Sequence, residues 1–245
     1  MTPIKSFQFR VEPEHIDFQK NISPMIMADM IVKTAGEDAK EKGFGLMDLH
    51  KKNYTWVISR FVMELDIIPT VDDILSIETW VRDVGNVFTT RDFRISNSEN
   101  KLLGHAVLSW AILDLDTRRS VPLSAVPELN DYIVDEDHPL VTPERLPDIE
   151  GEVSNSFEVR YSDVDLNVHT NTLKYLQCVF DCFSLDFYAK RILKRVEVNF
   201  LRELVYGDKG SVYIEEVEEN NFLFKLVTTE GVVVSRSRMM FEWKE

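Results

Sequence analysis

The chain is built from two similar halves, and this internal repeat limits the folds it can adopt. Each half begins with a short alternating strand, passes through a polar loop into an apolar helix, and ends in several strand-like runs. The first helix is predicted to start at Ser23-Pro24 and to end near Gly43, and the second to cover 171–183. An acidic, proline-containing segment over 135–152 separates the halves and is predicted to be a linker.

The predicted strands are rich in β-branched and aromatic residues and are separated by turn residues. They cover 6–11, 54–65, 74–84, 87–95 and 102–113 in the first half, and 153–160, 192–204, 210–217, 222–229 and 232–243 in the second. An apolar helix with antiparallel strands predicts a sheet wrapped around the helix, which is the hotdog architecture. We therefore expect an α+β tandem (double) hotdog fold, with an N-terminal domain over 1–134 and a C-terminal domain over 153–245. Because one unit leaves an edge strand and an open face, the two units are expected to pair.

The two loops that precede the helices can be aligned residue by residue, 148 positions apart, as Phe9 is from Phe157. Asp17 then matches Asp165, whereas Gln19 faces Asn167 and Asn21 faces His169. A second stretch aligns 135 positions apart, as Arg60 is from Arg195, and there Ile68 faces Glu203. Only the second half carries an amide, an imidazole and a second carboxylate, so the sequence predicts that any chemistry belongs to the C-terminal half.

Polar residues alternate with apolar ones in the second loop, and an extended loop would present them on one side. They are Asp163, Asp165, Asn167 and His169. One interpretation is an Asx-rich turn leading to a helix cap at Thr170 or Asn171. A calcium loop does not fit, because Val168 and Lys174 stand where glycine and the closing glutamate are required. A zinc site does not fit either, since no pair among the five histidines has ligand spacing. We expect no metal.

The catalytic interpretation places the same residues at the N-terminus of a helix, where unpaired N–H groups could hold a developing oxyanion. Asp165 could act as base or nucleophile, and Asn167 and His169 could orient it or the attacking water. Glu203, predicted to lie on a strand, could be the second carboxylate. The alternative for Glu203 is an exposed charge on a strand near a turn.

The formal net charge of −14 argues against nucleic acid as a partner. Five basic residues form local exceptions to this negative charge: Lys190, Arg191, Lys194, Arg195 and Arg202. A solvated strand start is the favoured interpretation, and a landing patch for an acidic or phosphate-bearing partner is the alternative. No apolar run approaches the ~20 residues of a membrane span, and the N-terminus has no signal-peptide pattern. The two cysteines, Cys178 and Cys182, are expected to be core residues in a reducing cytoplasm and not a disulfide.

The loop from Tyr161 to Asn171, followed by Tyr175, closely resembles the S-D-x-D-x-N-x-H-x-N-N-x-x-Y signature of the acyl-[acyl carrier protein] thioesterase family. This family comprises the plastid fatty-acid-releasing enzymes and their bacterial relatives. Further segments resemble the family in the same order along the chain, over residues 54–208. They are Trp56 to Arg60, Pro69 to Asp73, Glu78 to Val81 and Arg91-Asp92.

The resemblance implies a double-hotdog fold that hydrolyses fatty acyl-acyl carrier protein to free fatty acid and holo-acyl carrier protein in fatty acid biosynthesis. It carries four catalytic residues over to this chain: Asp165, Asn167, His169 and Glu203. Plant members have a cysteine after that glutamate, whereas this chain has Leu204, which argues against a thiol nucleophile. The resemblance also implies that the acyl chain enters the N-terminal half. No cofactor is expected, because the substrate carries its own phosphopantetheine.

Three other functions stay open at this point. They are an acyl-CoA thioesterase of similar fold, a non-catalytic acyl-binding module, and a hotdog dehydratase, whose motif order fits less well. Self-association into a homodimer also stays open.

Overall fold

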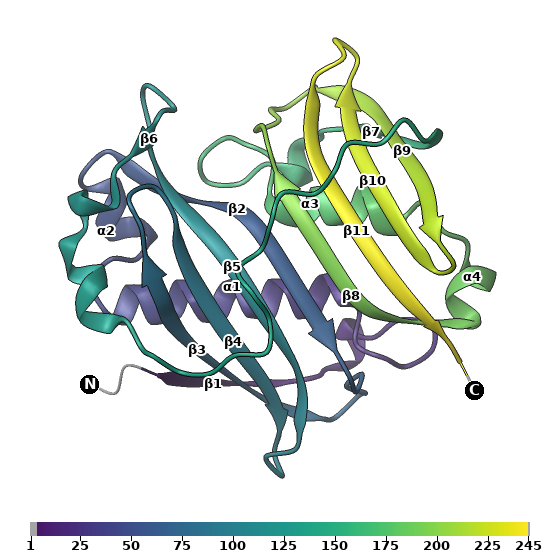
Figure 1. Cartoon of the computed structure of the whole chain (residues 1–245), viewed down its shortest axis with the longest axis horizontal. Coiled ribbons are helices and arrows are strands. Elements are labelled where there is room, and N and C mark those ends of the chain that lie inside the picture. The colour runs from purple at the N-terminus through teal and green to yellow at the C-terminus, as the bar shows by residue number, and fades with distance from the viewer. Residues whose placement is uncertain (1–3, 245) are drawn as a thin grey trace. The chain divides into compact units, whose positions relative to one another are not determined.

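The computed structural model describes residues 4–244, which divide into two compact units, one ending at Pro143 and the other starting at Glu144 (Figure 1). Within the described part of the chain, no helix is both long enough and apolar enough to cross a membrane.

The first unit is an antiparallel sheet with one long helix against it (Figure 1). Its elements are β1 (Lys5–Arg10), α1 (Pro24–Glu41), α2 (Leu46–His50), β2 (Tyr54–Leu65), β3 (Ile74–Val84), β4 (Thr89–Asn97), β5 (Leu102–Asp114) and β6 (Ser120–Val121). The strand order is β1-β3-β4-β5-β2, and β6 pairs with β5. Helix α1 lies against β1 and β3 and buries a face that includes Met27, Met30 and Ile31. This packing removes the apolar stripe of α1 from water.

The second unit repeats this plan with a shorter main helix. Its elements are β7 (Glu152–Glu158), α3 (Thr172–Phe180), α4 (Leu185–Ala189), β8 (Arg191–Phe200), β9 (Lys209–Glu218), β10 (Asn221–Thr228) and β11 (Val233–Trp243). The strand order is β8-β11-β10-β9-β7, with every pair antiparallel. Helix α3 buries Tyr175, Leu176, Cys178 and Val179.

The predicted element order agrees with the structure, and the bounds predicted for β2 and β3 are the observed ones. Some elements end earlier than predicted, among them β7 at Glu158, α3 at Phe180 and β8 at Phe200 in place of Leu204. The amides of Leu201 and Arg202 both donate to the carbonyl of Val234, at 2.9 and 3.1 Å, and this shared acceptor ends the regular ladder. Glu203 therefore lies in the loop between β8 and β9, and its predicted place on a strand is wrong.

Residues 134–151 contain no helix or strand, yet side chains of both units hold this segment by its backbone. In the first unit, Arg82 and Arg60 donate to the carbonyls of Leu140 and Pro143, at 2.7 and 2.6 Å. In the second, Asn199 accepts from the amide of Leu146 at 2.7 Å and donates to the carbonyl of Glu144 at 3.1 Å. The segment thus supplies backbone partners to polar side chains of each unit, of which Asn199 is buried.

A buried charge cluster joins α1 to the sheet of the first unit. Lys42 Nζ lies 2.9 Å from the Asp38 carboxylate, and both side chains are fully buried. Arg91 of β4 also contacts this carboxylate. Burial lowers the pKa of Lys42, and Asp38 opposes that shift. Loss of the Asp38 charge would therefore remove the carboxylate that both buried cations contact.

We expect Asp38→Asn to lower the free energy of unfolding by ~3 kcal/mol or more, because it removes the buried negative charge that Lys42 and Arg91 both contact. Urea denaturation measures this loss. The matched control is Asp29→Asn in the same helix, which breaks a 2.7 Å pair with an exposed Lys33. This control should cost under ~1 kcal/mol, and equal losses in the two variants would contradict the role assigned to burial.

Candidate active site

The loop before α3 is a closed turn, so the predicted extended loop with its polar residues on one side is wrong. A short 3-10 turn over Tyr161–Asp163 leads into it. The amide of Asp165 then donates to the carbonyl of His169 at 2.8 Å, and the amide of Val168 donates back to Asp165 at 3.1 Å. The Asp165 carboxylate explains the closure, because an Asx side chain that binds nearby amides folds the chain back on itself.

Asp165 Oδ1 accepts from the amide of Asn167 at 2.8 Å and from the amide of His169 at 3.3 Å. The residue is exposed. Its carboxylate thus organises the turn with one oxygen and remains accessible to solvent.

His169 and Glu203 meet although they come from different loops. His169 Nδ1 lies 2.7 Å from the carbonyl oxygen of Asn167. A carbonyl can only accept, so Nδ1 carries a proton and Nε2 is the nitrogen left to exchange one. Nε2 lies 3.7 Å from Glu203 Oε2, and the two side chains are 22% and 35% exposed. This arrangement suits a general base with a carboxylate beside it.

A hydrogen-bonded tie between the two loops explains why His169 and Glu203 meet. The amide and the hydroxyl of Thr170 both donate to the carbonyl of Leu204, each at 2.8 Å. Each of these residues directly follows one member of the pair. Sequence reasoning considered Thr170 only as a helix cap and missed this tie.

The side chain of Asp163 has a structural role in the loop. Its Oδ2 accepts from the amide of Arg160 at 2.8 Å, and its carboxylate pairs with Lys174 at 3.3 Å. The carboxylate therefore caps the 3-10 turn and anchors the loop to α3.

Asn171 caps α3, as one of the two predicted alternatives stated. Its Oδ1 accepts from the amide of Leu173 at 2.9 Å, and its carbonyl accepts from the amide of Lys174 at 2.9 Å. Two amides of the first turn are therefore occupied, which contradicts the expectation that they are unpaired and ready to hold an oxyanion.

The first unit contains the same turn. A comparison of the two turns shows which features belong to the repeated fold and which occur only at the second turn. Asp17 Oδ1 accepts from the amides of Gln19 and Asn21, at 2.8 and 3.1 Å. The amide of Asp17 donates to the carbonyl of Asn21 at 2.7 Å. The hydrogen bonds of Asp165 therefore belong to the repeated fold. Asn21 and Ile68 stand where the second unit has His169 and Glu203, so the imidazole–carboxylate pair is particular to the second copy.

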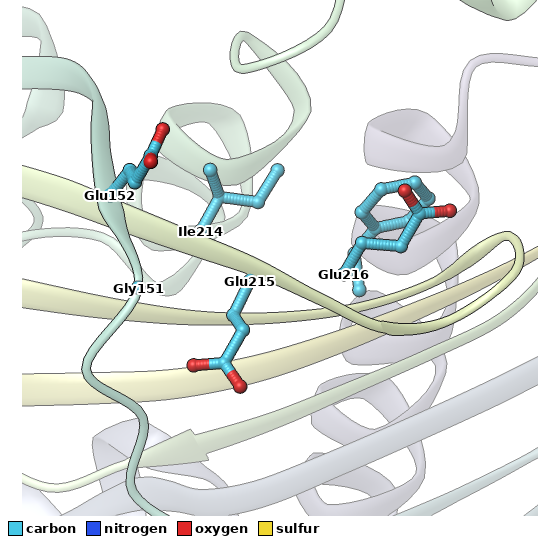
Figure 2. A pocket seen from close by; sticks show the side chains of 6 residues that line it. Gly151, Glu152, Ile214, Glu215 and Glu216 are labelled. Carbon is cyan, nitrogen blue, oxygen red and sulfur yellow. The ribbon is translucent and has the colours of Figure 1, made fainter.

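The second unit contains a pocket that other residues line (Figure 2). It is lined by Gly151, Glu152, Ile214, Glu215, Glu216 and Phe222. None of the four predicted site residues is among them, so this pocket gives no support to the predicted site.

Neither cysteine has the environment of a nucleophile. Burial raises the pKa of the Cys178 thiol to about 11 and also raises that of Cys182, so both stay protonated at neutral pH. Both are free, as predicted. Leu204 is buried at the position where plant members of the resembled family have a cysteine.

Two models of protein-family domains match the chain. The acyl-ACP thioesterase N-terminal domain matches residues 5–129, and the acyl-ACP thioesterase C-terminal domain matches residues 147–245. The chain belongs to the acyl-ACP thioesterase family. The resemblance seen in the sequence is thereby confirmed.

Solved structures agree with this assignment. An acyl-ACP thioesterase from Bacteroides thetaiotaomicron is 33% identical, covers 98% of each chain and superposes with a TM-score of 0.91. The 12:0-ACP thioesterase from Umbellularia californica shares the fold at 19% identity, with a TM-score of 0.85 over 100% of this chain and 99% of that one. These matches confirm the predicted α+β double-hotdog fold.

Curated plant relatives are longer than this chain. An oleoyl-acyl carrier protein thioesterase of Coriandrum sativum is 23% identical over 91% of this chain. A palmitoyl-acyl carrier protein thioesterase of Gossypium hirsutum is 29% identical over 66% of it. The matches span only 66% and 41% of the length of these two relatives.

Val168 in the site turn has a φ of 63°, a left-handed conformation that β-branched residues rarely adopt. The side chain is 69% exposed, so little packing offsets this strain. Val168→Asn should therefore raise the free energy of unfolding by ~1 kcal/mol, because asparagine tolerates this conformation. Lys20 is its counterpart in the first unit, with a φ of 67° and no branch at Cβ. Lys20→Asn should gain less in the same denaturation experiment, and an equal or larger gain would contradict the account.

Proposed function

We propose that this chain hydrolyses the thioester of fatty acyl-acyl carrier protein to free fatty acid and holo-acyl carrier protein, in fatty acid biosynthesis. The observation that carries the proposal is the contact between His169 Nε2 and Glu203, with the Nδ1 proton held by Asn167. Membership of the acyl-ACP thioesterase family supports the choice of substrate.

In the proposed reaction, water adds to the thioester carbonyl carbon while His169 Nε2 takes its proton. Glu203 stabilises the imidazolium that forms. The tetrahedral intermediate then expels the pantetheine sulfur, and the imidazolium returns the proton to it, so the products are a fatty acid and a thiol. Asp165 either takes the water's proton in place of His169 or attacks the carbonyl carbon itself. In the second route the pantetheine thiolate leaves as the anhydride forms, water deprotonated by His169 then cleaves the anhydride, and the imidazolium returns that proton to the thiolate. Neither route requires a cofactor beyond the phosphopantetheine of the substrate.

The repeat supplies a control for the chemistry of Asp165. In both Asp165→Asn and Asp17→Asn, the new side-chain oxygen can still accept from the two amides of its turn, so stability should change little. Asp165→Asn should nevertheless lower kcat by ~10²-fold or more, because the carboxylate is lost. Asp17→Asn should leave kcat within about twofold. Steady-state kinetics with an acyl-carrier-protein substrate measures both, and comparable kcat values for Asp165→Asn and the unaltered chain would contradict the role of Asp165.

An acyl-CoA thioesterase is the second candidate, because family membership alone does not fix the carrier of the acyl chain. Thiol release should proceed with at least ~10-fold higher kcat/KM on acyl-carrier protein than on the matching acyl-CoA, since protein–protein contacts add binding energy. Assays with carriers bearing the same acyl chain isolate this difference. Preference for acyl-CoA would refute the proposed substrate, and acyl binding without thiol release would indicate a binding module.

A cytoplasmic location and pairing as a homodimer are further parts of this proposal. Cell fractionation tests the first, and sedimentation equilibrium tests the second.

A further inference from the structure

The hydroxyl of Tyr175 bonds to the backbone on both sides of Glu203. It donates to the carbonyl of Arg202 at 3.1 Å and accepts from the amide of Leu204 at 2.9 Å. Tyr175 is 4% exposed, and its ring packs edge-on against Phe200 with centroids 5.5 Å apart. Burial raises the pKa of Tyr175, so the hydroxyl keeps the proton that it donates. The backbone groups that flank Glu203 are therefore bound to a side chain that is itself held by packing.

Thr170 holds the same backbone from the loop that carries His169. Its hydroxyl and its amide both donate to the carbonyl of Leu204. Leu204 thus receives hydrogen bonds from Thr170 at its carbonyl and gives one to Tyr175 from its amide. Both hydroxyls thus bond to backbone groups next to Glu203.

The first unit builds the corresponding tie without either hydroxyl. Its positions matching Tyr175 and Thr170 are Met27 and Ile22. The amide of Ile22 still donates to the carbonyl of Pro69, the counterpart of Leu204, at 2.8 Å. Proline has no N–H group, so no hydroxyl is needed there to satisfy one. The fold can therefore close this tie with backbone groups alone, and the hydroxyls occur in the copy that has Glu203.

We propose that the hydroxyls of Tyr175 and Thr170 are positioning groups that hold Glu203 against Nε2 of His169. The inference rests on the proposed hydrolase function. Small displacements of a group beside the reacting atoms cost much of the rate, so a rigid backbone at Glu203 has a direct effect on turnover. The competing explanation is that Tyr175 only satisfies the buried amide of Leu204 and contributes to stability alone.

Tyr188 provides a matched control for this competing explanation. It is a second tyrosine of the same unit, and its hydroxyl donates to the carbonyl of Phe180 at 2.8 Å. This carbonyl belongs to the last residue of α3, whereas the hydroxyl of Tyr175 bonds to the loop that carries Glu203. Tyr175→Phe and Tyr188→Phe each remove one hydroxyl, and each should lower the melting temperature modestly.

Tyr175→Phe should lower kcat about tenfold with little change in KM, whereas Tyr188→Phe should leave both within about twofold. A double-mutant cycle with Glu203→Gln gives the decisive readout. If Tyr175 acts through Glu203, adding Tyr175→Phe to Glu203→Gln causes no further loss of kcat. Independent, multiplicative losses would overturn the inference, as would equal kcat values for Tyr175→Phe and Tyr188→Phe.

Thr170 is tested by a conservative pair of variants. Thr170→Ser keeps the hydroxyl and should retain kcat within about threefold, whereas Thr170→Val keeps the shape and should lose about tenfold. Equal kcat values for these two variants would remove Thr170 from the proposal. Absence of thiol release by the unaltered chain on every acyl-carrier protein would instead refute the hydrolase function itself, so the two failures are distinguishable.

Discussion

A hydrogen bond between two loops is the interaction on which each unit depends. In the first unit the amide of Ile22 donates to the carbonyl of Pro69, and in the second the amide of Thr170 donates to the carbonyl of Leu204, both at 2.8 Å. Each bond joins the residue before the cap of the main helix to the loop that follows a long strand. The helix is thereby fixed at its N-terminal end while its apolar face packs on the sheet.

The repeat preserves this backbone network while its side chains diverge. Asp17 and Asp165 close the same turn in the two units, and Lys20 and Val168 both adopt positive φ there. Since one copy keeps the turn with no imidazole, the hydrogen bonds of Asp165 are not by themselves evidence of catalysis. A few substitutions at matched positions distinguish the two copies, and in the second unit they bring His169 and Glu203 together.

Several features of the site were predictable from sequence because they are local. Asn171 was one of two expected caps, since asparagine before an apolar helix is a recognised cap signal. The ends of β2 and β3 followed from their composition and flanking turns. The end of β8 did not, because Leu201, Leu204 and Val205 continue an apolar run after the ladder has stopped. The local pattern of apolar residues does not determine which carbonyl on another strand accepts a hydrogen bond from a given amide.

The sequence by itself determined the duplication, the strand and helix order, the family and the half of the chain that carries the distinctive polar residues. Only the tertiary structure decided that Thr170 and Leu204, 34 residues apart, bond to each other and bring His169 within 3.7 Å of Glu203. It also decided that Tyr175 spans the backbone of Glu203 and that the first turn of α3 is already occupied by Asn171. The physical reason is that these contacts join residues distant in the chain, and their geometry is set by packing of the helix on the sheet.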